Sequence, residues 1–288
     1  MKHAFLILAH NEFDILFRLI ACLDDERNDI YIHFDKKTRY TPIINTQKAS
    51  LFVLKDRVDV RWGDFSMVKA EFLLFEKALE NGPYLYYHLL SGVDLPLKSQ
   101  NYIHDFFDKN RGKEFIGYMN DWTPSMLEER FQYWYLFPKD FRKYWGAKRV
   151  LRISFIRIQQ LLRIKRKISL PLKKGSQWVS ITEGMVKLFL SNKAWITKTY
   201  RNTFCSDESV FQTICWSSPY RNNLYNSSDD GIGCMRLIGW RTNGQLEDWC
   251  RDDYELLGNA PHLFARKFNY SDIDFIQDVL ALSNKAKD

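Results

Sequence analysis

Blocks of hydrophobic and polar positions follow one another along the first third of the chain, and each block has the length and period of one element. Continuous apolar runs are typical of strands buried on both faces, and apolar residues at helical spacing are typical of amphipathic helices. In chain order, the pattern predicts strands over residues 4–9, 30–34, 51–54 and 84–90, and helices over residues 12–23 and 64–81. This order predicts an α/β chain with an open, mostly parallel central sheet flanked by helices.

Two carboxylates fall directly after predicted strands. Asp35 follows the strand at residues 30–34, and Asp94 stands in a turn that contains glycine and proline after the strand at residues 84–90. Ligands of open α/β sheets bind beyond the carboxyl ends of the strands, so both side chains are candidates for ligand contacts. A strand-end cap or a purely structural turn explains either residue as well, and the sequence leaves these alternatives open.

The second half of the chain has weaker periodicity. It predicts strands near residues 115–118 and 235–240, a helix that begins near Asp207, and a C-terminal helix after Ser271. Neither an internal repeat nor a linker rich in glycine and serine divides the chain. We therefore expect a single domain over residues 1–288.

Excess positive charge is confined to one segment. Residues 139–174 hold thirteen Lys and Arg residues against one acid, Asp140, so this segment carries +12 and the rest of the chain carries −5. Cations and apolar residues interleave over residues 148–167, which suits a helix whose cationic flank faces anionic lipid. A helix packed on the domain with solvated charges explains the pattern equally well, and both interpretations stay open.

The same segment admits a different class of protein, a noncatalytic binder of nucleic acid or another polyanion. Aromatic residues lie among the cations, including Tyr144, Trp145 and Phe155. No recognition module accompanies them and the rest of the chain is net acidic, so this alternative is disfavoured and nucleic acid is not expected as a partner.

The composition excludes several classes. A chain with 45% hydrophobic and 27% charged residues is neither disordered nor fibrous. It has no apolar run of about 18 residues and its first residues do not form a signal peptide, so a cytoplasmic location is expected. Five cysteines without C-x-x-C spacing predict reduced thiols. The chain also lacks the P-loop, G-x-G-x-x-G, H-E-x-x-H and G-x-S-x-G motifs, which disfavours kinases, dehydrogenases, zinc proteases and serine hydrolases.

The one D-x-D motif, Asp272-Ile273-Asp274, is of a kind that can hold a divalent metal. It follows Ser271 and opens an apolar helical run, where carboxylates are favoured by the helix dipole. We interpret it as a helix start and expect no metal site.

Acidic and basic residues elsewhere are candidates for chemistry. Asp207 and Glu208 stand side by side at a predicted helix start, where one of them can cap the helix or act as a general base. Four cations near the ends of elements can bind phosphate oxygens without a metal, or can simply be solvated surface charge: Arg236, Arg241, Arg266 and Lys267.

Eight motifs, taken in order, resemble one known family. They are Leu-Ala-His-Asn near the start and the segments at residues 32–37, 60–68, 87–98, 175–178, 206–209, 235–240 and 262–268. The chain resembles the core-2 and I-branching β-1,6-N-acetylglucosaminyltransferase family, which includes the peptide O-xylosyltransferases, in the form of a compact bacterial member. The resemblance spans roughly residues 4–270.

This resemblance implies a nucleotide-sugar-binding fold of the GT-A type, an inverting mechanism and no required metal. Glu208 matches the catalytic base of the family. Arg236 and Lys267 match the cations that stabilise the leaving UDP diphosphate, and Asp35 matches a contact to the nucleoside. Ser206 stands where animal members have proline, so acceptor specificity does not transfer.

The resemblance also assigns a role to each part of the chain. Residues 1–120 are expected to bind the nucleotide, residues 121–174 to form a basic and aromatic insertion, and residues 175–288 to carry the acceptor and catalytic half. Further donor-site residues are expected to be Asp94, Gly175, Ser176, Gln177 and Trp178.

The expected substrates are a UDP-sugar and the hydroxyl of a glycan. N-acetylglucosamine is the favoured donor sugar and xylose the alternative, because the family includes users of both. The basic segment would help to hold an enzyme at the inner face of a membrane, because cations are attracted to anionic lipids. A lipid-linked glycan is therefore one candidate acceptor.

Overall fold

The computed structural model describes residues 1–138, 146–240 and 245–285, with side chains to residue 283. Residues 139–145, which open the basic segment, lie outside the described residues, as does Arg241.

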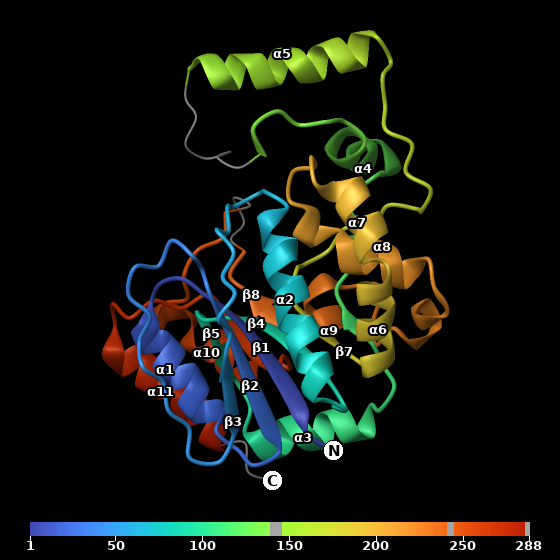
Figure 1. Cartoon of the computed structure of the whole chain (residues 1–288). Coiled ribbons are helices and arrows are strands. Elements are labelled where there is room, and N and C mark those ends of the chain that lie inside the picture. Colours follow the sequence, from blue (N-terminus) through green and yellow to red (C-terminus); the bar gives the residue numbers. More distant parts are fainter. Residues whose placement is uncertain (139–145, 241–244, 286–288) are drawn as a thin grey trace.

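A six-stranded sheet in the order β3-β2-β1-β4-β7-β6 forms the centre of the molecule (Figure 1). Its strands are β1 (His3–Ala9), β2 (Asn28–Phe34), β3 (Ser50–Val53), β4 (Tyr87–Ser91), β6 (Phe115–Ile116) and β7 (Val179–Ile181). The first four strands run parallel, and β7 and β6 are antiparallel to their neighbours. The prediction of an α/β chain with a mostly parallel central sheet flanked by helices is confirmed, and this is the layout that the GT-A expectation requires.

Helices α1 (Phe13–Leu23) and α2 (Ser66–Asn81) cover opposite faces of this sheet. Successive side chains of a strand point to opposite faces, so β1 divides its residues between two cores. Phe5 and Ile7 pack in the core that contains α1, whereas Leu6 and Leu8 pack in the core that contains α2. Both helices and all four parallel strands lie within about three residues of the predicted positions.

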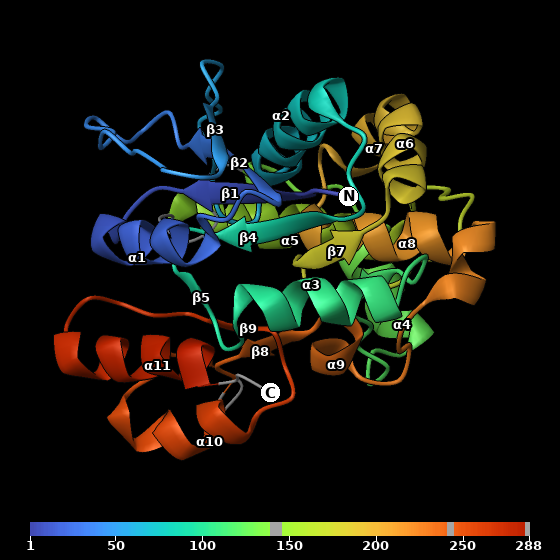
Figure 2. The same cartoon turned by 90° about the horizontal axis from the view of Figure 1, so that it is seen from below.

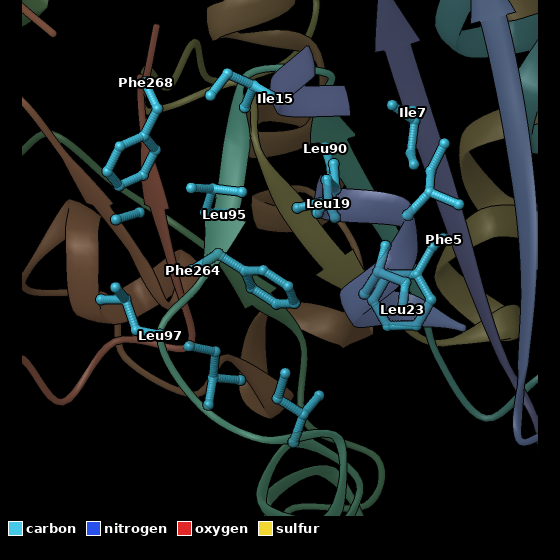
Figure 3. Packing of buried hydrophobic residues seen from close by; sticks show 14 of the residues in the cluster. Phe5, Ile7, Ile15, Leu19, Leu23, Leu90, Leu95, Leu97, Phe264 and Phe268 are labelled. Carbon is cyan, nitrogen blue, oxygen red and sulfur yellow. The ribbon is translucent and has the colours of Figure 1, made fainter. Parts of the chain in front are cut away.

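A second sheet, of three strands, lies beside α1. It has the order β5-β9-β8 and consists of β5 (Asp94–Pro96), β9 (Phe264–Arg266) and β8 (Arg236–Ile238). Figure 3 shows Leu95 and Phe264 of this sheet facing Leu19 and Phe5, so one apolar core joins the two sheets. Both sheets combine strands from residues 1–120 with strands from residues 175–288.

Several predicted boundaries need correction. Asp94 follows the predicted turn at Gly92 and Val93 but also begins a strand, β5, that was not predicted, and the strand predicted at residues 84–90 starts only at Tyr87. The strand predicted at residues 115–118 is two residues long. Strands this short carry no readable alternation, so their pairing partners decide where they begin and end.

The remaining helices surround the two sheets. They are α3 (Gln100–Lys109), α4 (Pro124–Phe131), α5 (Ala147–Leu161), α6 (Glu183–Ser191), α7 (Lys193–Tyr200), α8 (Val210–Trp216), α9 (Asp230–Cys234), α10 (Tyr254–Asn259) and α11 (Ile273–Lys285). Figure 2 shows α10 and α11 beside the second sheet, on the side away from β1. A 3₁₀ turn at Ser206–Glu208 precedes α8, in agreement with the helix start predicted there. No helix in the described part of the chain is long and apolar enough to cross a membrane.

Three buried histidines pack together between the central sheet and α3. Nε2 of His88 lies 3.0 Å from Nδ1 of His3, and the ring of His104 lies 4.2 Å from that of His3. Burial lowers the pKa of His3 to about 2 and that of His104 to about 4, and it lowers the pKa of His88 as well. All three side chains are therefore neutral in the folded protein at neutral pH.

Mild acid is expected to destabilise the fold through these histidines. In the unfolded chain they titrate near pH 6.5, so below that pH the unfolded state binds more protons and the free energy of unfolding falls with pH. Each such histidine contributes up to about 1.4 kcal/mol per pH unit. Urea unfolding between pH 7.5 and 5 measures this slope, and His104→Asn is expected to make it shallower. An unchanged slope in the variant would contradict the assignment.

Candidate active site

Asp35 lies at the carboxyl end of β2, beside the end of β1. Its backbone nitrogen donates to the carbonyl oxygen of Ala9 at 2.9 Å, which fixes the residue next to the neighbouring strand. The buried carboxylate accepts hydrogen bonds from the backbone nitrogen of Lys37 at 2.8 Å and from its Nζ at 2.6 Å. The strand-end position predicted for Asp35 is confirmed, and its contact to a nucleoside stays a prediction.

Asp94 anchors a cation from β9. Its Oδ1 accepts from Nε of Arg266 at 3.1 Å and its Oδ2 accepts from the backbone nitrogen of Ser91 at 2.9 Å. Burial raises the pKa of the Asp94 carboxyl, and Arg266 counteracts this effect. The guanidinium of Arg266 also lies 4.1 Å from the ring centroid of Trp178. A fully buried Asp94 therefore orients Arg266.

His10 lies near both the carboxylate after β2 and the arginine at the end of β9. Burial lowers the pKa of His10, the charge of Asp35 opposes this, and the charges of Lys37 and Arg266 reinforce it. Arg266 therefore lies within electrostatic reach of the residues after β1 and β2. We call His10, Asp35, Lys37, Asp94 and Arg266 the strand-end cluster.

Glu208 forms a second cluster with two cations. Its Oε2 lies 2.9 Å from Nη2 of Arg130 and 3.1 Å from Nζ of Lys174. The side chain of Glu208 is 29% exposed, while those of Arg130 and Lys174 are more buried at 19% and 6%. Both cations also face the ring of Trp122, at 5.3 and 4.7 Å from its centroid. The carboxylate is thus held in one position with an edge open to solvent, and we call this group the base cluster.

Asp207 and Glu71 lie behind the base cluster. Burial and the charge of Glu208 raise the pKa of Asp207, and burial together with Asp207 raises the pKa of Glu71. Gln177 donates from Nε2 to Oε1 of Glu71 at 2.7 Å. Oδ1 of Asp207 is buried and has no hydrogen-bond partner among the described residues. Of the two adjacent acids predicted as base candidates, Glu208 is the one that forms direct ion pairs with Arg130 and Lys174 and is partly exposed, whereas Asp207 is buried behind it.

The segment Gly175–Trp178 connects the two clusters. At one end the backbone nitrogen of Gly175 donates to the carbonyl oxygen of Glu208 at 2.9 Å, and at the other end Trp178 lies against Arg266. Between them, the backbone nitrogen of Ser176 donates to Oδ1 of Asp230 at 2.7 Å. Three residue steps span at most about 10 Å between the Cα atoms of Gly175 and Trp178, so one short segment contacts residues of both clusters.

Gly175 has no room for a side chain. A Cβ atom there would lie 2.0 Å from the carbonyl oxygen of Gly117, which is backbone and cannot move aside. Gly175→Ala is therefore expected to destabilise the protein by at least about 2 kcal/mol and to displace Glu208. Gly258→Ala is the matched control, because the nearest atom there lies at 3.5 Å and the residue is helical. Thermal unfolding and sugar-transfer rates measure both effects, and a Gly175→Ala variant that matches the wild type would contradict them.

The two cations matched to the leaving diphosphate occupy different environments. Arg236 is 1% exposed, and it donates from Nη1 to the carbonyl oxygen of Cys234 at 2.8 Å and from Nη2 to Oγ of Ser180 at 2.9 Å. Burial lowers its pKa to about 10. Lys267 is 34% exposed and its Nζ lies 2.6 Å from Oδ1 of Asp248. Arg236 is therefore buried, whereas Lys267 and its neighbour Arg266, whose side chain is 15% exposed, are partly accessible to solvent.

The described residues contain no group of three or more His, Cys, Asp and Glu side chains that could hold a metal ion. The D-x-D residue Asp272 accepts from the backbone nitrogen of Phe275 at 2.8 Å and pairs with Arg251 at 3.0 Å. Its interpretation as a helix-start carboxylate is confirmed. The cysteines are free thiols, as predicted.

Two functional candidates escaped the sequence analysis. Lys174 directly precedes the motif that begins at Gly175, so its position next to the site was readable. Arg130 belongs to a helix of the insertion, about eighty residues before Glu208 in the chain. No sequence pattern indicates that Arg130 contacts Glu208.

Comparison with known proteins identifies the family. Residues 3–262 match the family described as Core-2/I-Branching enzyme. The chain belongs to this family. Because its members are glycosyltransferases, the prediction of that enzyme class is confirmed. The relatives include xylosyltransferase 2 of Canis lupus familiaris and of Rattus norvegicus, each 22% identical over 93% of this chain, and that of Mus musculus, 21% identical over the same share.

This family member spans 32% of the length of those curated relatives. Among solved structures, mouse xyloside xylosyltransferase 1 in its apo form matches with a TM-score of 0.37 and 11% identity, over 91% of this chain and 97% of that one.

Proposed function

We propose that this chain is an inverting, metal-independent glycosyltransferase that moves a sugar from a UDP-sugar to a glycan hydroxyl, with Glu208 as general base. One observation carries the proposal. The partly exposed carboxylate of Glu208 is held by two cations, and a segment of four residues contacts the backbone of Glu208 at one end and an arginine at the end of β9 at the other. A general base for the acceptor and a cationic site for the leaving group are the two components that a single displacement requires.

The reaction follows from these positions. Glu208 accepts the proton of the acceptor hydroxyl while the hydroxyl oxygen attacks the anomeric carbon of the donor. The bond between that carbon and the diphosphate oxygen breaks, and its electron pair leaves with UDP. Arg266 and Lys267 stabilise the negative charge on the diphosphate, which needs donors and positive charge more than metal coordination. One displacement from the face opposite UDP inverts the anomeric centre.

The donor sugar is proposed to be xylose or N-acetylglucosamine. The names of the curated relatives support UDP-xylose, and the resemblance to the branching enzymes supports UDP-N-acetylglucosamine. The acceptor is proposed to be a glycan, with a lipid-linked glycan as one form of it.

A panel of UDP-sugars tests the proposal. Purified protein is expected to hydrolyse or transfer from one of them, with the initial rate unchanged in excess EDTA. A strict requirement for manganese or magnesium would overturn metal independence. A noncatalytic polyanion binder would neither bind nor turn over any UDP-sugar, so that result would overturn the enzyme proposal itself.

A further inference from the structure

Helix α5 buries two polar residues and exposes several large apolar ones. Arg152 is 7% exposed and Gln159 is 3% exposed, whereas Leu161 is 82% exposed and Val150 is 62% exposed. Gln159 exchanges two hydrogen bonds with the backbone of Trp134, both at 3.0 Å. These hydrogen bonds help to attach the helix to the rest of the protein. In Figure 1 it lies at the margin of the molecule, above α4.

The exposed apolar residues form one face. Residues three, four and seven apart lie on the same side of a helix. The members with more than 45% exposure are Val150, Leu151, Ile153, Ile158 and Leu161, and Leu162 continues the face beyond the helix end. We call these six residues the outer face. Packing of α5 on the domain, one of the two interpretations of the sequence, does not account for a row of large apolar side chains in water.

The charges around the outer face select the partner. Arg157 lies on the exposed side of the helix, and Arg163 and Lys167 are exposed just beyond it. No acidic residue occurs from position 141 to position 174. A symmetric dimer through this face would place two such segments against each other, and like charges would oppose it. The complementary partner is apolar inside and negative at its surface.

We infer that the outer face of α5 binds an anionic lipid bilayer. The helix lies in the interface, its apolar side chains enter the acyl boundary, and the cations contact anionic headgroups. This binding requires neither donor nor acceptor, so it stands apart from the proposed function.

The position of α5 relative to the base cluster indicates how the enzyme would be oriented on the membrane. Lys165, just after α5, lies 2.8 Å from Oε2 of Glu128 on α4, and two residues further along α4 Arg130 pairs with Glu208. Helix α4 thus contacts both the segment that follows α5 and the base cluster. If the proposed function holds, an acceptor held at the bilayer would approach Glu208 from this side.

Vesicle sedimentation tests the inference. The wild-type protein is expected to pellet with vesicles of phosphatidylcholine and phosphatidylglycerol at low salt, to be released at high salt, and to stay in solution with phosphatidylcholine alone. The charge variant Arg157→Gln/Arg163→Gln/Lys167→Gln should lose about fivefold in partitioning per cation, or about 100-fold together. The apolar variant Val150→Ser/Ile158→Ser/Leu161→Ser should lose at least about tenfold.

A matched control separates this face from general surface hydrophobicity. Ile43 and Leu256 are 82% and 54% exposed elsewhere on the protein, and Ile43→Ser/Leu256→Ser is expected to partition like the wild type. Equal unfolding midpoints confirm that each variant is folded. Equal recovery with neutral and anionic vesicles, or wild-type partitioning of the apolar variant, would overturn the inference. The inference would also be overturned if the wild type does not bind vesicles but forms a dimer in analytical ultracentrifugation, and the apolar variant is monomeric.

Discussion

Glu208→Gln is expected to lower the rate of sugar transfer by about 100-fold to 10,000-fold, the usual cost of losing a general base. The amide keeps the shape of the side chain and still accepts hydrogen bonds from Arg130 and Lys174, but it cannot take a proton from the acceptor. The affinity for UDP should change little, because Asp35, Arg266 and Lys267, which are assigned to the nucleotide, make no contact with the Glu208 carboxylate. Initial rates with the preferred donor and calorimetric titration with UDP measure the two quantities.

A second carboxylate provides the control for this substitution. Glu128 also pairs with a lysine, Lys165 at 2.8 Å, and it lies on the helix that carries Arg130. Glu128→Gln should therefore transfer sugar at nearly the wild-type rate. If Glu208→Gln keeps more than about a tenth of the wild-type rate, Glu208 is not the base, and Asp207→Asn becomes the variant that must abolish transfer.

The parts of the fold that the sequence predicts are the elements whose hydrophobic pattern extends over many residues. The strand over residues 3–9 is apolar almost throughout and the helix over residues 66–81 has four turns, so tertiary contacts only adjust their ends. The strands β5 and β9 have three residues each and exist because Leu95 and Ala265 pair across 170 residues of sequence. Pairing at that distance leaves no trace in local periodicity. The helix at Gln100–Lys109 was missed although Ser99 caps it.

The candidate site divides in the same way. Glu208 is recognised by its neighbours in the sequence, and Asp35 by its place after a strand. Arg130 comes to Glu208 only through the packing of α4, which no pattern in the chain predicts. The choice between Arg236 and Arg266 depends on burial, because Arg236 pairs with Phe264 and Arg266 lies two residues further along β9 on the same face of the sheet. Local sequence pattern does not reveal which of two such arginines is covered by the rest of the fold.

Lys267→Ala and Arg266→Ala are each expected to weaken UDP binding by about 10-fold to 150-fold, which corresponds to the loss of one charge-assisted hydrogen bond of about 1.5–3 kcal/mol. Both side chains are partly exposed, and Arg266 is positioned by Asp94 and Trp178. Their loss removes positive charge from the leaving diphosphate, so the transfer rate should fall as well. Lys193→Ala, at another partly exposed lysine in an ion pair, is the control and should bind UDP normally.

Arg236→Ala is expected to behave differently from these two variants. Its guanidinium is fully buried and donates hydrogen bonds to Oγ of Ser180 and to the carbonyl oxygen of Cys234. The substitution removes both of these hydrogen bonds. The free energy of unfolding should fall by at least about 2 kcal/mol. Urea unfolding and UDP titration on the same samples separate the two roles. If Arg236→Ala unfolds like the wild type but binds UDP weakly, Arg236 belongs to the diphosphate site after all. If Lys267→Ala binds UDP normally, Lys267 does not contact the diphosphate.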